Sequence, residues 1–180
     1  VLGLLKNGRL KGLADNMEYP VLLIISMLLE ASTGLLVKLL PGIFPEYLWA
    51  LVILQYALIF AFFMLNSHNW PVSVMALGVL LNFAVIISNG GRMPVSSIAY
   101  NYPGFTRVMD RIQSGAIPEY FIMDHRVPFW FLGDIIAIPL AGMASAGDLV
   151  MMAGMVLFIF ICMTSNRPKH LKTRRHRRAA

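Results

Sequence analysis

Long apolar segments with almost no charge constrain this chain more than any other feature. Each of four segments approaches the roughly 20 residues that an α-helix needs to cross a bilayer: Pro20–Leu40, Glu46–Leu65, Pro71–Ser88 and Asp148–Thr164. Only 13% of the residues are charged, whereas soluble domains carry about 25% because their surfaces need charge. The sequence therefore predicts an all-α, multi-pass integral membrane bundle of about four to five transmembrane helices.

The remaining segments divide the chain into one membrane-embedded domain, 1–165, and a tail, 166–180. Val1–Leu5 is an apolar stub that we interpret as the end of a further helix. Residues 97–127 are predicted to form an extramembrane loop, in which Thr106–Gln113 could form a short interfacial helix. Residues 128–147 are apolar but interrupted by Gly and Pro, so we expect a re-entrant or interfacial hairpin there.

The charge distribution predicts a topology. The net charge of +6 comes from the tail, which we place in the cytoplasm together with the basic residues near the N-terminus. The three preceding spans then place the long loop outside the cell. An odd number of crossings must follow this loop to return the chain to the cytoplasm, so only one of 128–147 and Asp148–Thr164 should span. The basic residues of the tail are Arg167, Lys169, Lys172, Arg174, Arg175, Arg177 and Arg178.

Several short strings resemble a bacterial membrane family known as domain of unknown function 5317. They are GLLKNGRL from Gly3, NGGRMPVS from Asn89, FLGDII from Phe131 and SAGD from Ser145. The resemblance covers nearly the whole chain and implies a multi-pass protein of the bacterial cytoplasmic membrane. It implies no activity.

The polar residues of these strings form the first candidate site: Asn89, Gly90, Gly91, Arg92, Asp134, Ser145 and Asp148. A charge near hydrocarbon usually has a partner, and Arg can bridge carboxylates with its planar fork. We therefore expect Arg92 to pair with Asp134 or Asp148, either as a structural clasp or as a ligand site. In the ligand alternative, exposed N–H groups at the two glycines would hold an anion. Ser145 and Asp148 are also candidates to cap the last helix.

Glu30 and Asn82 are the polar residues that we place inside the membrane. Glu30 could relay protons, hydrogen-bond to Asn82, or belong to a helix-packing stripe with Ser26 and Thr33. We favour the packing role.

Two functions remain open from the sequence. The first is a non-enzymatic accessory or scaffold subunit of a larger membrane complex, whose tail contacts anionic lipid head groups. The second is a lipid- or small-molecule-handling protein, a transporter or membrane enzyme, with a site around Arg92, Asp134 and Asp148. We expect no nucleic-acid partner and no metal site. The single cysteine, Cys162, excludes covalent haem, zinc and iron–sulfur motifs built on CxxC and leaves the cofactor content unknown.

Overall fold

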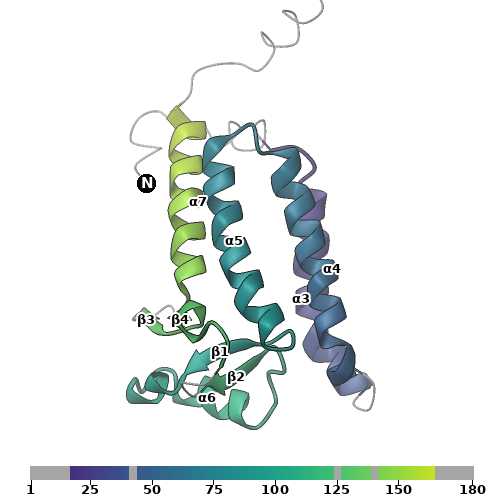
Figure 1. Cartoon of the computed structure of the whole chain (residues 1–180), viewed down its shortest axis with the longest axis vertical. Coiled ribbons are helices and arrows are strands. Elements are labelled where there is room, and N and C mark those ends of the chain that lie inside the picture. The colour runs from purple at the N-terminus through teal and green to yellow at the C-terminus, as the bar shows by residue number, and fades with distance from the viewer. Residues whose placement is uncertain (1–16, 41–43, 124–126, 139–141, 165–180) are drawn as a thin grey trace, which may run out of the picture.

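The computed structural model describes residues 17–40, 44–123, 127–138 and 142–164. Four long helices run along one another, and smaller elements lie at one end of them (Figure 1). The helices are α3 (Val21–Leu39), α4 (Phe44–Leu65), α5 (Trp70–Ser88) and α7 (Ala146–Thr164). We call the described residues between 89 and 145 the cap.

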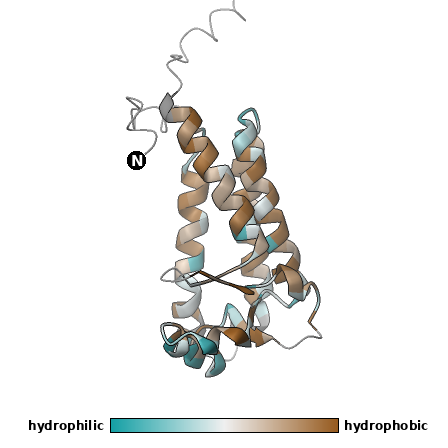
Figure 2. Cartoon of the chain, turned by 90° about the vertical axis from the view of Figure 1, so that its left-hand side faces the viewer, coloured by the Kyte–Doolittle hydropathy of each residue, from teal (hydrophilic) through white to brown (hydrophobic). Residues whose placement is uncertain are grey.

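Among the described residues, two helices are long and apolar enough to cross a membrane: α4, over Tyr47–Leu65, and α5. Shorter apolar stretches occupy Val21–Leu36 of α3 and Ala146–Cys162 of α7. Figure 2 shows hydrophobic colours along the four helices and the strongest hydrophilic colours toward the cap. The described part of the chain is thus mostly helical.

The chain reverses direction between these helices, so the start of α3 and the end of α7 lie at the same end of the bundle (Figure 1). Asn66, in the turn between α4 and α5, holds the start of α3. Its Oδ1 accepts from Glu18 N at 2.7 Å, and its Nδ2 donates to Glu18 O at 2.8 Å. A core that includes Phe62, Met75 and Phe158 joins α4, α5 and α7 at this end.

Glycines bring α5 and α7 together. A Cβ at Gly154 would lie 2.7 Å from Met75 Cγ and 2.9 Å from Pro71 O. A Cβ at Gly147 would overlap Asn82 Oδ1. Small residues allow such close approach of helix backbones, which gains dispersion contacts over the whole interface.

The cap corrects the all-α prediction, because it contains two small sheets. Strand β1 (Met93–Ser96) pairs in parallel with β2 (Tyr120–Met123), with Met93 opposite Tyr120. Strand β3 (Ile136–Ile138) pairs antiparallel with β4 (Gly142–Ala144). Short helices complete the cap: η1 (Ser97–Asn101), α6 (Thr106–Gln113) and η2 (Trp130–Leu132). All four residues of β1 are buried, so the strand lacks the polar and apolar alternation that would have identified it.

One expectation about this region is confirmed. The helix predicted at Thr106–Gln113 has those bounds as α6, and its Met109 and Ile112 face the core of the cap. Within the described residues of 128–147, strands β3 and β4 pair antiparallel, and β4 leads into α7. Whether this segment enters the membrane stays a prediction. The stub at Val1–Leu5 and the basic tail lie outside the described residues.

Candidate functional site

A closed hydrogen-bond network joins α5 to the start of α7. Ser145 and Asp148 form a reciprocal cap: Asp148 N donates to Ser145 Oγ and Ser145 N donates to Asp148 Oδ2, both at 2.9 Å. Asn82 then bridges both side chains, donating to Asp148 Oδ1 and accepting from Ser145 Oγ, each at 2.7 Å. The capping prediction for Ser145 and Asp148 is confirmed. Asn82 belongs to this network and Glu30 accepts from Gln55, so the alternative in which Glu30 hydrogen-bonds to Asn82 is not observed among the described residues.

The two glycines after α5 end the helix. Gly90 and Gly91 have φ values of 68° and 82°. Gly90 N donates to Ile87 O at 3.4 Å, and Gly91 N donates to Ile86 O at 3.0 Å. This is a Schellman arrangement, which occupies both N–H groups. The predicted anion site at these N–H groups is therefore wrong. Asn89, the C-cap residue of α5, also donates from Nδ2 to Val85 O at 2.7 Å and to Pro128 O at 3.0 Å. These bonds tie Pro128 to the end of the helix.

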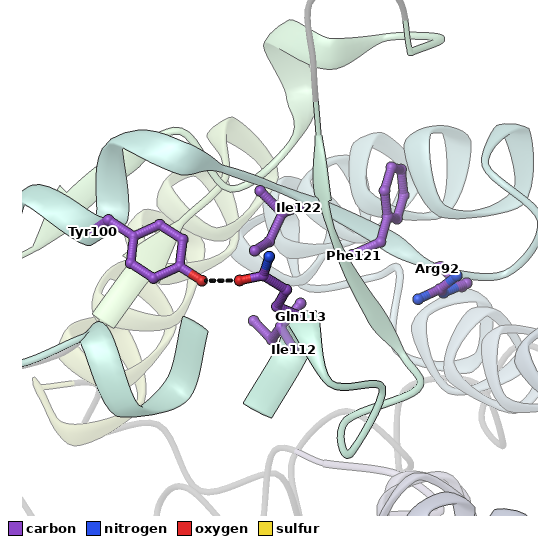
Figure 3. Close-up of a pocket in the computed structure, with 6 residues that line it drawn as sticks. All are labelled: Arg92, Tyr100, Ile112, Gln113, Phe121 and Ile122. Carbon is purple, nitrogen blue, oxygen red and sulfur yellow. Dashed lines mark hydrogen bonds between the residues drawn. The ribbon is translucent and has the colours of Figure 1, made fainter. Parts of the chain in front are cut away.

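Arg92 does not make the predicted pair with Asp134 or Asp148. Its Nε donates to Pro118 O at 3.0 Å, and its Nη2 donates to Tyr120 O at 2.8 Å. The guanidinium also lies 5.5 Å from the centre of the Phe121 ring. Arg92 also lines a hollow of about 390 Å³. In Figure 3, Arg92 lies at one side of this hollow and the hydrogen-bonded pair Tyr100 and Gln113 at the other. Arg92 thus holds the segment before β2 against β1.

Asp134 is positioned by its own backbone rather than by Arg92. Asp134 N donates to Pro94 O, and Ser96 N donates to Asp134 O, both at 2.9 Å. These bonds form a parallel bridge to Val95, on β1. At the neighbouring Gly133 a Cβ would lie 2.7 Å from Pro94 O, so only glycine permits this approach. The strings NGGRMPVS and FLGDII are therefore brought together by backbone pairing.

The side chain of Asp134 is buried without a full set of partners. It is 7% exposed, and its Oδ1 has no hydrogen-bond partner within the described residues. Buried polar atoms are nearly always hydrogen-bonded, and an exception often marks a functional site. Burial, reinforced by the charge of Asp148, raises the pKa of Asp134 to about 7.

Asp134 lines a cavity of about 290 Å³ between α6 and the β3–β4 hairpin. Most of the wall is apolar, and Tyr120 and Asp134 contribute the polar groups. Burial, followed by the charge of Asp134, raises the pKa of Tyr120 to about 12, which keeps its hydroxyl neutral. The apolar wall includes Val95, Phe105, Met109, Ile112, Ile117 and Met143.

Glu30 lies apart from this cavity, on α3. It is exposed on the helix surface and accepts a hydrogen bond from Gln55 Nε2 at 3.2 Å. Ser26 and Thr33, at helical spacing on either side, are each 2% exposed. Ser26 and Thr33 are thus buried as a packing stripe requires, whereas the side chain of Glu30 is exposed.

Sequence reasoning identified Asp134 but missed the rest of the cavity wall. Met109 and Ile112 had a signal, because they form the apolar side of an otherwise polar short helix. Tyr120 and Met143 had none, because both lie in short strands whose pairing is not local. The predicted tail residues, Arg167, Lys169, Lys172, Arg174, Arg175, Arg177 and Arg178, lie outside the described residues.

Comparison with known proteins identifies a family. The model of a family of unknown function (DUF5317) matches residues 15–160. No curated protein and no solved structure matches the chain.

Proposed function

The chain belongs to the family of unknown function DUF5317, and from this premise we propose that it is a four-span membrane protein whose cap binds a small, largely apolar molecule. The observation that carries the proposal is the unpartnered, buried Asp134 in the wall of the apolar cavity. A well-formed apolar pocket with a few convergent polar groups is the usual form of a ligand site. The Asn82–Ser145–Asp148 network and the glycine cap of α5 hold the cap on the helices.

The surface of the helices supports the membrane location. Large apolar side chains are widely exposed along all four, including Met27 at 66%, Met64 at 75% and Val156 at 60%. Soluble monomers rarely expose continuous apolar surfaces of this extent. Phe129, Trp130 and Phe131, at the cap end of the bundle, are about half exposed, between 45% and 52%. Aromatic residues in such a place are typical of a membrane interface.

Four spans with a cytoplasmic tail place the cap outside the cytoplasm and the turn between α4 and α5 inside it. The two ends of the bundle should therefore be labelled differently. Ser97 lies exposed in the cap and Ser67 lies exposed in the turn between α4 and α5. In spheroplasts, a membrane-impermeant maleimide is expected to label Ser97→Cys and to leave Ser67→Cys unlabelled until the cells are lysed. The parent chain, with its buried Cys162, supplies the background. The reverse pattern would show that the cap faces the cytoplasm.

Binding in the cavity is tested with cyclohexanol, a compact apolar probe, on protein in lipid nanodiscs. The ¹³C-methyl signal of Met143, in the cavity wall, is expected to shift saturably with a dissociation constant on the order of 1 mM, as for a probe of few heavy atoms. The signal of Met155, exposed on α7, reports partition into lipid and should not saturate.

Filling the cavity provides the matched variants. Met109→Trp adds volume in the cavity wall and is expected to abolish the saturable shift of Met143. Ile98→Trp adds a similar volume at a cap residue that is 54% exposed, and binding should persist. Equal saturable binding by both variants would reject the cavity as the site.

Glu30 favours a second candidate function, an accessory subunit of a membrane complex. A carboxyl group exposed on an apolar helix is costly in lipid and usually marks a functional contact. Affinity purification in mild detergent would then recover a stoichiometric membrane protein from the wild type and lose it from Glu30→Leu. Recovery of the chain alone from both would remove this candidate.

A further inference from the structure

The cap fixes the backbone of Asp134 against β1, because both of its backbone hydrogen bonds are made with the neighbours of Val95. The side chain is 7% exposed, and its Oδ1 is buried without a hydrogen-bond partner in the described chain. Leaving a buried carboxyl oxygen unpaired is unfavourable, and a ligand that donates a hydrogen bond to this carboxyl group would offset that penalty.

The electrostatic surroundings of Asp134 are negative. The nearby carboxyl group of Asp148 is bound by Asn82 and by the Ser145 backbone, neither of which carries a positive charge. Arg92 directs its guanidinium to two backbone carbonyl groups. No basic side chain lines the cavity in the part of the cap that the structure describes. A cation bound in the cavity would therefore stabilise the ionised form of Asp134, since an opposite charge nearby favours the charged form of a carboxyl group.

We infer that the ligand of this cavity is a cation, a protonated amine on a compact apolar body, and this inference rests on the proposed function. The ammonium group donates a charge-assisted hydrogen bond to the carboxylate of Asp134, which lines the cavity. Phe105 and Tyr120 supply aromatic surfaces that attract a cation, and Met109 and Ile112 cover the apolar body.

The alternative ligand charges fit less well. An anion would meet both Asp134 and Asp148 without a compensating donor. A neutral hydrogen-bond acceptor would require Asp134 to stay protonated and would gain nothing from the negative surroundings. Because the pKa of Asp134 is about 7, the group is readily ionised by a neighbouring positive charge near neutral pH.

The test compares three probes of the same shape, cyclohexylamine, cyclohexanol and cyclohexanecarboxylate, at pH 7.5 with the Met143 methyl signal as readout. The amine is expected to bind about tenfold more tightly than the alcohol, as one charge-assisted hydrogen bond provides. The carboxylate should not bind measurably. In Asp134→Asn the preference for the amine should disappear while cyclohexanol still binds. Asp110→Asn, which neutralises an exposed carboxyl group of α6, should retain the preference.

The outcomes separate this inference from the proposed function. If cyclohexanol binds as tightly as the amine, and Met109→Trp abolishes both, the cavity is a ligand site but the cation inference is wrong. The same holds if the amine preference survives Asp134→Asn. If none of the three probes shifts Met143 saturably, both the inference and the proposed function fail.

Discussion

Replacing Gly147 by Ala is expected to destabilise the protein by about 3 kcal/mol, at the upper end of the cost of overpacking a core. The new methyl group would overlap Asn82 Oδ1 and would lie 2.6 Å from the backbone carbonyl of Gly78. The carbonyl belongs to a helix and cannot move alone, so α5 and α7 must separate. That separation would also break the bonds from Asn82 to Ser145 and Asp148.

Gly34→Ala is the matched control, because a Cβ at Gly34, on α3, meets nothing within 4 Å. Alanine is favoured over glycine within a helix by roughly 0.5–1 kcal/mol, so this variant should be as stable as the wild type or slightly more stable. Unfolding by a denaturing detergent, followed by tryptophan fluorescence, compares the two. Equal stability of both variants would mean that α5 and α7 do not approach as closely as described.

Replacing Asp134 by Asn is expected to remove a pH dependence of stability. The pKa of Asp134 is about 7 in the folded protein, against a usual value of 3.8, so the folded state binds the proton more tightly than the unfolded state does. Stability from this group is therefore complete below about pH 4, falls as the pH rises through 7, and is flat above that. A shift of about three pKa units corresponds to about 4 kcal/mol.

The difference between wild type and Asp134→Asn isolates this contribution from other titrating groups. The variant is expected to gain stability relative to the wild type between pH 5 and pH 8, measured by the same unfolding assay. Asp110→Asn should follow the wild type at every pH, because Asp110 is exposed. Parallel curves for all three proteins would show that Asp134 titrates as an exposed carboxyl group does. A buried carboxyl group that costs stability is typical of a site kept for binding or chemistry.

The positions of the long helices could be predicted from the sequence because their ends are marked locally. Pro20 precedes α3, a proline opens α5, and two glycines close it. Apolar runs between such signals fix a helix to within a few residues without any knowledge of the fold. The same reasoning found α6, whose apolar residues have helical spacing, and the reciprocal cap at Ser145 and Asp148.

The partners across the cap could not be predicted, because they depend on pairings between distant short segments. Arg92 was expected to pair with a carboxylate on charge alone, but the β1–β2 register brings the carbonyl groups of Pro118 and Tyr120 to it instead. Strands of three or four residues are too short to carry a periodic signal, and β1 is buried along its whole length. Asp134 was found as a polar residue in an apolar segment, but its lack of a partner became visible only in the folded cap.

The central claim, that Asp134 is a buried binding group in the cap cavity, is tested most directly by its own titration. The ¹³C signal of the Asp134 carboxyl group, assigned by its loss in Asp134→Asn, would be followed with pH in nanodiscs, with and without cyclohexylamine. We expect a midpoint near pH 7 that moves to lower pH when the amine is added, because the cation stabilises the carboxylate. A midpoint near pH 4, the range of an ordinary aspartate, unchanged by the amine, would contradict both the burial and the binding role of Asp134.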